Sequence, residues 1–368
     1  MSANNTFKSK LRKTLIVSLF NNYTDNVDTY RFKKNITDTS KTKSSFRKIL
    51  SGIKTNLQSR KDFNKQKREL VSYFEYLYGL LEDDYSKELL VKVCAFRILG
   101  HKKVKLPMNS PAFWNTISTI ENEIANKNDS IQIKFMNWEI FKYSLNTLGY
   151  PINIYLNACG VYYTFVYKCY VYTNGKTTVG IKEGDYVIDA GACHGDTALF
   201  FAHQAGKKGK IYSFEFVPEN MEVLSNNLNL NSELKDHISV IRNPLWSKKG
   251  VPVYYKSNGP GTVVNMNSMG ADSSSVLTTT IDELVSNGSI EKVDFIKMDI
   301  EGAETEALKG AENTLRKFKP RLAISLYHRP IDFKVIPEYL KSLDIGYKFY
   351  YNHYTMHAEE SVLFCTIE

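Results

Sequence analysis

The feature that most constrains the fold of this chain is a short apolar stretch that leads through a glycine turn into a helix. Residues 186–190 are mostly apolar, which predicts a buried strand of the kind found in parallel sheets. Glycine begins and ends the turn over residues 191–195, so its backbone can approach a ligand closely. Asp196 or Thr197 then suits the capping position of a helix. Together these elements predict the first unit of a doubly wound α/β sheet, with a site at the C-terminal end of the strand.

The residues around this turn indicate which ligand the site takes. The spacing Gly191-x-x-x-Gly195 differs from the G-x-G-x-x-G turn that seats a dinucleotide pyrophosphate. Asp189 ends the strand, and an acid there suits a cationic ligand group better than a phosphate. A second predicted strand ends in Glu215, 20 residues after Gly195, where an acid commonly accepts hydrogen bonds from ribose hydroxyls. The combination predicts S-adenosylmethionine; a Rossmann-like fold that binds NAD, or no ligand, is the alternative.

Three later strands are expected to bring further side chains to the same edge of the sheet. Asn243 follows the third strand, where it would lie beside the adenine. Asp299 ends a buried strand that starts at Val293, and His328 ends the next one. Because the C-terminal ends of parallel strands share one edge, Asp299 and His328 are candidates for chemistry. Glu304 opens the following helix, and we interpret it as a helix-capping residue.

Charge and cysteine content narrow the class of protein. Residues 1–70 contain 17 Lys and Arg against 5 Asp and Glu, a net +12, whereas the whole chain carries +9. The basic character therefore belongs to the N-terminal arm, which could touch RNA or an anionic membrane face, or simply be solvated. The 5 cysteines form no C-x-x-C pair, which argues against a zinc site or a disulfide framework and favours a cytoplasmic location. No apolar run approaches the length of a transmembrane helix.

The chain divides into three predicted regions. Residues 1–60 form a basic arm, expected to be disordered or loosely helical, and residues 61–150 a helical cap. Residues 151–368 form the sheet domain, and within it the aromatic run 161–172 is interpreted as strands. Residues 247–276 are rich in Gly, Ser and Asn, and are interpreted as a lid or an insertion.

Four segments resemble the FkbM-type family of S-adenosylmethionine-dependent methyltransferases. They are Val187-Ile-Asp-Ala-Gly-Ala-Cys-His-Gly-Asp-Thr197, Phe214-Glu-Phe-Val-Pro-Glu-Asn220, Ile296-Lys-Met-Asp-Ile-Glu-Gly-Ala-Glu304 and Tyr327-His-Arg-Pro330. The resemblance covers roughly residues 75–368, and His194 departs from it because relatives often carry an aromatic residue there. It implies a Rossmann-like class I methyltransferase fold, with a seven-stranded, mostly parallel sheet, one antiparallel strand and a helical N-terminal region.

The resemblance also implies O-methylation of a sugar, a surface glycan or a secondary metabolite. We expect the cofactor to contact Asp189, Gly191, Ala192, Gly195, Asp196, Thr197, Glu215, Phe216 and Asn243. A hydroxyl must lose its proton to become a good nucleophile, so we expect His328 to act as general base with Asp299 and Glu301 as catalytic partners. No metal is required by this scheme, although Asp299 and Glu301 could alternatively hold a divalent ion.

Two other functions stay open at this level. One is an RNA or protein methyltransferase that holds its substrate with the basic N-terminal arm. The other is a non-catalytic module that kept the nucleotide pocket. The expected partner is a small-molecule or glycan acceptor rather than a nucleic acid, and the arm allows weak peripheral contact with a membrane.

Overall fold

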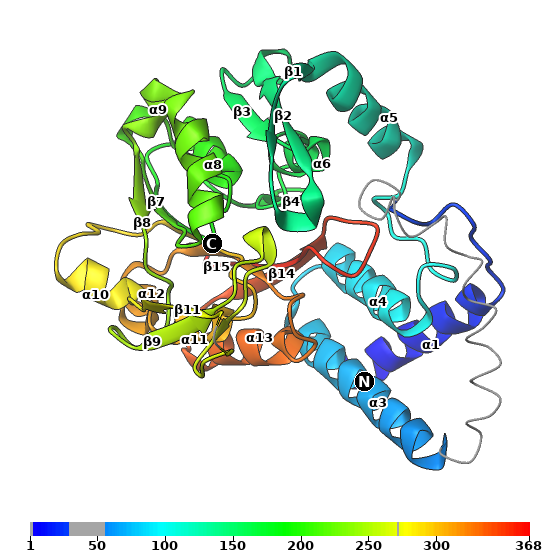
Figure 1. Cartoon of the computed structure of the whole chain (residues 1–368). Coiled ribbons are helices and arrows are strands. Elements are labelled where there is room, and N and C mark those ends of the chain that lie inside the picture. Colours follow the sequence, from blue (N-terminus) through cyan, green and yellow to red (C-terminus); the bar gives the residue numbers. More distant parts are fainter. Residues whose placement is uncertain (1–2, 29–55, 271) are drawn as a thin grey trace.

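The computed structural model describes residues 3–28, 56–270 and 272–368, and a seven-stranded sheet forms its centre (Figure 1). The strands run across the sheet in the order β14-β15-β13-β12-β6-β7-β8. Their bounds are β6 (Tyr186–Ala190), β7 (Lys210–Phe214), β8 (Ile238–Ile241), β12 (Phe295–Met298), β13 (Arg321–Ser325), β14 (Lys348–His353) and β15 (Ser361–Thr366). Within this sheet, β15 runs antiparallel to the other six strands. The predicted Rossmann-like sheet with one antiparallel strand is confirmed.

Successive residues of the strands point to opposite faces of the sheet and into two hydrophobic cores. Val187 and Phe295 belong to one core, and Ile188 and Ile296 to the other; all four are fully buried. This alternation is the period of two that a sheet covered on both faces requires. The helices that follow β6 are α7 (Asp196–Ala205), α8 (Pro218–Asn229), α9 (Ser232–Lys235), α10 (Ile281–Ser286), α11 (Glu304–Lys309), α12 (Glu312–Phe318) and α13 (Asp332–Ser342).

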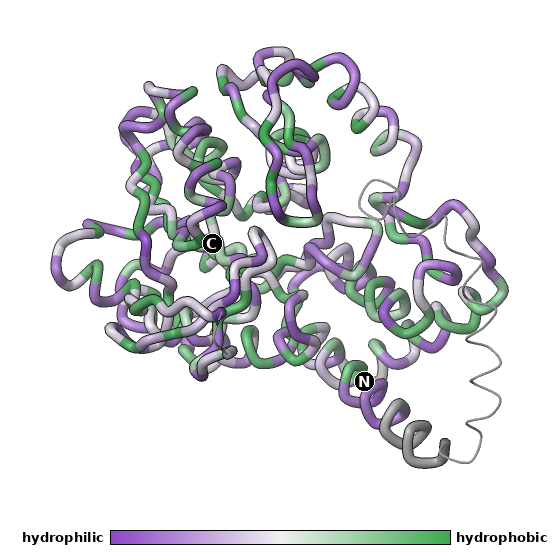
Figure 2. The backbone as a smooth tube through the Cα atoms, viewed as in Figure 1, coloured by the Kyte–Doolittle hydropathy of each residue, from purple (hydrophilic) through white to green (hydrophobic). Residues whose placement is uncertain are grey.

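Three N-terminal helices, α1 (Ala3–Leu19), α3 (Asn56–Leu80) and α4 (Asp84–Leu99), extend the core that contains Ile188. Asp83 caps α4 by accepting a hydrogen bond from the Ser86 amide at 2.8 Å, and the chain leaves the helix at Gly100. The Phe74 ring stacks on Phe333 of α13 with 4.1 Å between ring centroids. Figure 2 shows hydrophobic stretches where these helices meet. No helix within the described ranges is both long and apolar enough to cross a membrane.

The expectation of a disordered or loosely helical basic arm concerns residues 1–60, and the part from 29 to 55 lies outside the described residues. In the part that is described, α1 packs against α3 and α4. Phe7 and Leu11 are the α1 side chains buried in this contact, at 0% and 4% exposure. Residues 3–19 are therefore a docked helix.

Two segments differ from the structure predicted from the sequence. The expected helical cap over 61–150 contains strands: β1 (Ala125–Gln132) and β2 (Glu139–Ser144) form a sheet with β3 (Asn153–Leu156). The aromatic run 161–172, predicted to be strands, begins instead as the end of α6 (Ala158–Val161) and a π-helical turn over Tyr162–Val166. Asn157 caps this helix by accepting from the Gly160 amide at 2.7 Å. The cap and the burial of its aromatic side chains in the core outweigh their β propensity.

The remaining elements border the sheet. They are α5 (Pro111–Thr119), the hairpin of β4 (Tyr172–Asn174) and β5 (Thr177–Val179), and a small sheet of β9 (Pro252–Tyr255), β10 (Val264–Asn265) and β11 (Ser274–Leu277). The small sheet occupies the segment 247–276, which the sequence predicted to be a lid or an insertion. Residues 258–262, between β9 and β10, border the candidate site.

Candidate functional site

The C-terminal ends of β6, β7, β12 and β13 border a polar cavity of about 600 Å³. Of the predicted site residues it is lined by Gly191, Asp196, Thr197, Glu215, Asp299, Glu301 and His328. The carboxylates in its lining are those of Asp28, Asp196, Glu215, Asp299, Glu301, Glu359 and Glu360, whereas Lys297 supplies the one lysine. The cavity is therefore acidic. A narrower pocket of about 60 Å³ beside it adds Phe216, Pro244 and Leu245.

The glycine turn brings β6 against β12 at the floor of this cavity. Gly191 has φ of +82°, and a Cβ atom there would lie 1.9 Å from the carbonyl oxygen of Asp299. Only glycine fits this close approach and this left-handed conformation. The amides of Gly191 and Ala192 donate to the Phe214 carbonyl at 3.1 and 3.0 Å, so they tie the turn to β7. The turn is thus shaped by its two neighbouring strands.

Asp189 lies beneath the turn rather than in the cavity. Its side chain is fully buried, and Lys297 Nζ lies 3.2 Å from its Oδ1. The Thr197 hydroxyl donates to both oxygens of Asp189 at 3.0 and 2.9 Å. Lys297 Nζ also donates to the carbonyls of Ala190 and Gly191 at 3.1 and 2.6 Å. Asp189 therefore positions the turn through Lys297, where the sequence predicted a direct contact with the cofactor.

Burial lowers the pKa of the Lys297 ammonium, but the carboxylates of Asp189, Asp299 and Asp196 raise it overall. Lys297 therefore stays charged although only 2% of its side chain is exposed. Its ammonium also lies over the Tyr170 ring, 5.3 Å from the centroid.

The start of α7 differs in detail from the prediction. Gly195 occupies the capping position with φ of +84°, and neither Asp196 nor Thr197 caps the helix. Instead Asp196 accepts a hydrogen bond from the Thr164 hydroxyl at 2.6 Å. His194, the departure from the family pattern, lines the cavity, and burial lowers the pKa of its imidazole to about 4. A neutral ring is therefore present at that wall.

Glu215 stands at the end of β7 with its carboxylate at the cavity wall. Its Oε1 accepts from the amides of Phe216 and Val217, both at 2.7 Å, and its Oε2 accepts from Asn220 Nδ2 at 3.1 Å. Burial raises the pKa of Glu215, while these donors oppose the rise. A carboxylate has about four lone-pair sites, so three donors leave capacity for a ligand hydroxyl.

Asn243 does not line either cavity. Its side-chain amide donates to the Leu277 carbonyl at 2.9 Å, and the residues that follow it, Pro244 and Leu245, line the narrower pocket. The side-chain amide of Asn243 thus ties the end of β8 to the small sheet, and the place of Asn243 beside the adenine stays a prediction.

Asp299 faces the cavity with both carboxylate oxygens engaged. Oδ2 accepts from the Tyr170 hydroxyl and Oδ1 from the Tyr327 hydroxyl, each at 2.9 Å. Burial would raise the pKa of Asp299, but His328 and Lys297 lower it well below its usual range. Asp299 is therefore a fixed, ionised carboxylate.

His328 is surrounded by acids. Its Nε2 lies 3.2 Å from Asp299 Oδ1 and 3.6 Å from Glu301 Oε1, and its Nδ1 lies 3.0 Å from Glu304 Oε1. Burial lowers the pKa of the imidazole, but these three carboxylates raise it far above its usual range. The ring is then protonated, which does not fit the general-base role predicted for it, because an imidazolium cannot accept a further proton.

Glu301 is the carboxylate best placed to accept the proton of an acceptor hydroxyl. Burial raises its pKa, with His328 opposing the rise, and 30% of its side chain is exposed. It has a left-handed φ of +55°, a strained conformation for a residue with a side chain. Glu304 is fully buried and accepts from the Ile300 amide at 2.8 Å. The N-cap of α11 is Ala303 and no side chain caps it, so Glu304 ties the preceding loop to the helix and does not cap it, contrary to the interpretation from the sequence.

The acidic cluster also fits a divalent cation. Asp299, Glu304 and His328 each offer a ligand atom, and these atoms lie within 4.8 Å of one another. Both His328 ring nitrogens and Glu304 Oε2 are buried without an aligned hydrogen-bond partner. Metal ligands in a preformed site show this pattern, since they are oriented toward an ion and not toward one another. The set differs from the expected pair of Asp299 and Glu301, because Glu304 takes the place of Glu301.

The outer rim of the cavity is partly aromatic. Phe135 and Trp138 meet edge to face at 5.3 Å between ring centroids, and both line the cavity with Tyr163. Opposite them lie His357 and Asp28, whose side chains approach to 3.8 Å. Asp28 thus brings the N-terminal segment to the site.

Sequence reasoning missed Tyr170, Tyr327 and Lys297. Tyr170 lies in the run that was predicted to be strands, and Lys297 is the strand residue that pairs in register with Asp189. A lysine inside a four-residue buried strand was the signal that could have identified the ion pair.

Comparison with known proteins identifies the sheet domain. Residues 189–349 match the model of the methyltransferase FkbM domain. The hexuronic acid methyltransferase AglP of Haloferax volcanii is 28% identical over 169 residues, which are 45% of this chain and 65% of the relative. The methyltransferase sdnD of Sordaria araneosa is 28% identical over 179 residues, or 40% of this chain and 68% of the relative.

Among solved structures, the methyltransferase FkbM of Methylobacillus flagellatus superposes with a TM-score of 0.50 at 20% identity. The match covers 80% of this chain and 58% of that protein. The chain therefore spans less than two thirds of the length of AglP and of this solved relative. The superposition supports the fold.

The Lys297–Asp189 pair makes a first prediction. In Lys297→Met the buried Asp189 carboxylate loses its counter-ion, and the carbonyls of Ala190 and Gly191 lose the ammonium as a donor, so urea unfolding should show a loss of about 3–5 kcal/mol. The matched control is Lys292→Met, which breaks a surface pair with Asp294 at 2.8 Å and should cost about 1 kcal/mol or less. Equal losses for the two variants would contradict the role given to the buried pair.

Proposed function

We propose that this chain, whose residues 189–349 match the methyltransferase FkbM domain, transfers a methyl group from S-adenosylmethionine to a hydroxyl of a sugar or a similar hydroxylated molecule. The observation that carries the proposal is the acidic cavity at the C-terminal ends of the strands. S-adenosylmethionine is cationic at its sulfonium and its ammonium, so carboxylates attract it. A dinucleotide brings a pyrophosphate, which the same carboxylates would repel.

The donor is proposed to lie across the end of β7 and the glycine turn. Glu215 would accept a hydrogen bond from a ribose hydroxyl with the lone pair that its three present donors leave free. Phe216, Pro244 and Leu245 line the narrower pocket, and their apolar surfaces suit the adenine ring. Gly191 allows the methionine part to pass close to the backbone.

The acceptor is proposed to enter over the aromatic rim. The faces of Phe135 and Trp138 suit the C–H faces of a sugar ring, and the polar groups beyond them suit its hydroxyls. One relative is named as a hexuronic acid methyltransferase, which supports a sugar as the acceptor.

The transfer itself needs one proton to move. The acceptor oxygen forms its bond to the methyl carbon as the sulfur–carbon bond breaks, and the sulfur keeps the electron pair and becomes neutral. Glu301, which is partly exposed at the cavity wall, accepts the proton of the hydroxyl. Holding both reactants in line supplies much of the rate.

Asp299 and His328 position that step. The hydroxyls of Tyr170 and Tyr327 fix the Asp299 carboxylate, and the His328 ring lies between Asp299 and Glu304. A divalent ion held by Asp299, Glu304 and His328 would act as a Lewis acid that lowers the pKa of the acceptor hydroxyl.

Calorimetry with S-adenosylmethionine tests the donor site. The chain should bind it, and Glu215→Gln should weaken binding by about 10- to 100-fold, because hydrogen bonds to a charged group are worth about 1.5–3 kcal/mol. Glu222→Gln, an exposed acid on α8, is the control and should bind normally. No binding by the unaltered chain would defeat the proposal.

Methyl transfer from labelled cofactor to extracted surface glycans tests the chemistry. Asp299→Asn and Glu301→Gln should each slow turnover by about 10²–10⁴-fold with cofactor affinity largely kept, since both act on the transfer step. Glu306→Gln is the control, because that acid contacts Ser247 and Lys309 outside the cavity. Normal turnover in Glu301→Gln would exclude Glu301 as the base.

A further inference from the structure

Helix α1 has an apolar outer face at its C-terminal end. Lys13, Ile16, Val17 and Phe20 follow the spacing i, i+3, i+4, i+7, which places them on one side of the helix. Ile16, Val17 and Phe20 are 48%, 60% and 87% exposed, and Leu19 beside them is 55% exposed. These side chains stand out because apolar groups of this size are normally covered. In Figure 2 this hydrophobic end lies at the right-hand edge of the molecule.

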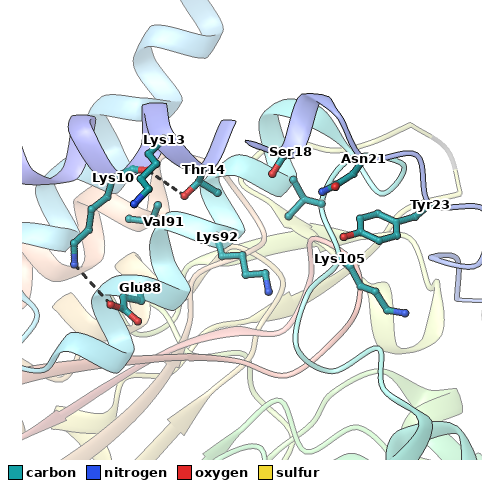
Figure 3. A pocket seen from close by; sticks show the side chains of 11 residues that line it. Lys10, Lys13, Thr14, Ser18, Asn21, Tyr23, Glu88, Val91, Lys92 and Lys105 are labelled. Carbon is teal, nitrogen blue, oxygen red and sulfur yellow. Dashed lines mark hydrogen bonds and ion pairs between the residues drawn. The ribbon is translucent and has the colours of Figure 1, made fainter. Parts of the chain in front are cut away.

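A basic groove of about 430 Å³ lies beside this apolar end, between α1 and α4 (Figure 3). Its cations are Lys10, Lys13, Lys92 and Lys105. Its polar groups are Thr14, Ser18, Asn21 and Tyr23. Glu88 is the one acid in the lining, and its contact with Lys10 is long, at 3.9 Å. The groove therefore carries a net positive charge together with neutral donors, which is the chemistry that binds phosphate.

Within the part of the chain that the structure describes, two of these lysines have no acidic partner. Among the described residues, no carboxylate forms an ion pair with Lys13 or Lys92. Lys92 is partly buried, and burial lowers the pKa of its ammonium. An anion bound in the groove would offset the free-energy cost of keeping this ammonium charged there.

The loop after α4 adds charge at the same place. Lys103 Nζ donates to the carbonyls of Leu19 and Asn21 at 3.0 and 2.6 Å, which holds this loop against the end of α1. Lys102 next to it is exposed. Helix α1 itself carries four basic residues, the lysines 8, 10 and 13 and Arg12, and no acid.

We propose that these groups form a docking surface for an anionic lipid bilayer, and we name it the α1 surface: Lys10, Lys13, Ile16, Val17, Leu19, Phe20, Lys92, Lys102 and Lys105. Headgroup phosphates occupy the groove, and the exposed apolar side chains enter the boundary between headgroups and acyl chains. Three of the four exposed apolar side chains, Ile16, Val17 and Leu19, are aliphatic, which suits a bilayer better than the series of aromatic rings on which the bases of single-stranded RNA stack.

The α1 surface is separate from the methyl-transfer cavity. No residue lines both the basic groove and the acidic cavity. Docking through α1 therefore engages none of the residues that line the cavity. This inference goes beyond the proposed function and does not rest on it.

Vesicle co-sedimentation of the full chain tests the proposal. Phosphatidylcholine vesicles with about 30% phosphatidylglycerol should bind at least about tenfold more protein than phosphatidylcholine alone. The binding should fall as salt rises above about 0.15 M. Val17→Ser with Phe20→Ser should lower the partition coefficient by about tenfold or more. Lys13→Gln and Lys92→Gln should each lower it by about fivefold.

Matched controls lie elsewhere on the surface. Leu277→Ser removes an apolar side chain that is 56% exposed, and Lys207→Gln removes an exposed lysine, so both should bind vesicles as the unaltered chain does. Calorimetry with S-adenosylmethionine checks that every variant keeps its cavity, which separates a failure here from a failure of the proposed function.

Several results would overturn the proposal. Equal binding to neutral and anionic vesicles would remove the role of the lysines, and no binding to either would remove the surface altogether. A dimer in sedimentation equilibrium that Phe20→Ser dissociates would show that a second copy covers this face. RNA retained on filters by lysines 13 and 92, with no binding to vesicles, would assign the groove to a nucleic acid.

Discussion

The buried ion pair between Lys297 and Asp189 is the interaction on which the site depends. The two residues face each other across β12 and β6, and neither is more than 2% exposed. Lys297 also donates to the carbonyls of Ala190, the last residue of β6, and Gly191, the first residue of the glycine turn, so one ammonium joins two central strands to the loop at the cavity floor. A buried pair of this kind adds little net stability over an apolar pair, and its value here is geometric, because it fixes where the turn lies.

The rest of the cavity follows from the order of the strands. Since β7, β6, β12 and β13 are adjacent and parallel, the residues after each strand, Glu215, Gly191, Asp299 and His328, meet at one edge. The loops then supply more carboxylates than cations. The resulting negative potential is a property of the assembled edge, and no single segment carries it. Under the proposed function, this potential attracts a cationic donor before any specific hydrogen bond is formed.

The sequence was sufficient to predict which residues lie at the strand ends around the site, but not which side chains contact one another there. The glycine turn, Glu215 and Asp299 could be placed because strand ends in a doubly wound sheet have a known position. The pairing of Asp189 with Lys297 could not, because it depends on which strand lies beside β6. Tyr170 was missed because a run of aromatic residues favours strands locally, while the capped helix and the core decide otherwise.

The protonation of His328 was also beyond the sequence. A lone histidine suggests a base with an ordinary pKa, but three carboxylates from the segment 299–304, which precedes the histidine by more than 20 residues in the chain, surround it after folding. The same acidic segment accounts for the fit to a divalent ion, because either a proton on His328 or a metal ion would offset the negative charge of these carboxylates.

A crystal structure of the chain with S-adenosylhomocysteine tests the central claim most directly. The account predicts that the ribose hydroxyls lie within hydrogen-bond distance of the Glu215 carboxylate and that the sulfur faces Asp299 and Glu301 across the cavity. A ligand bound at another place, or a ribose turned away from Glu215, would contradict it.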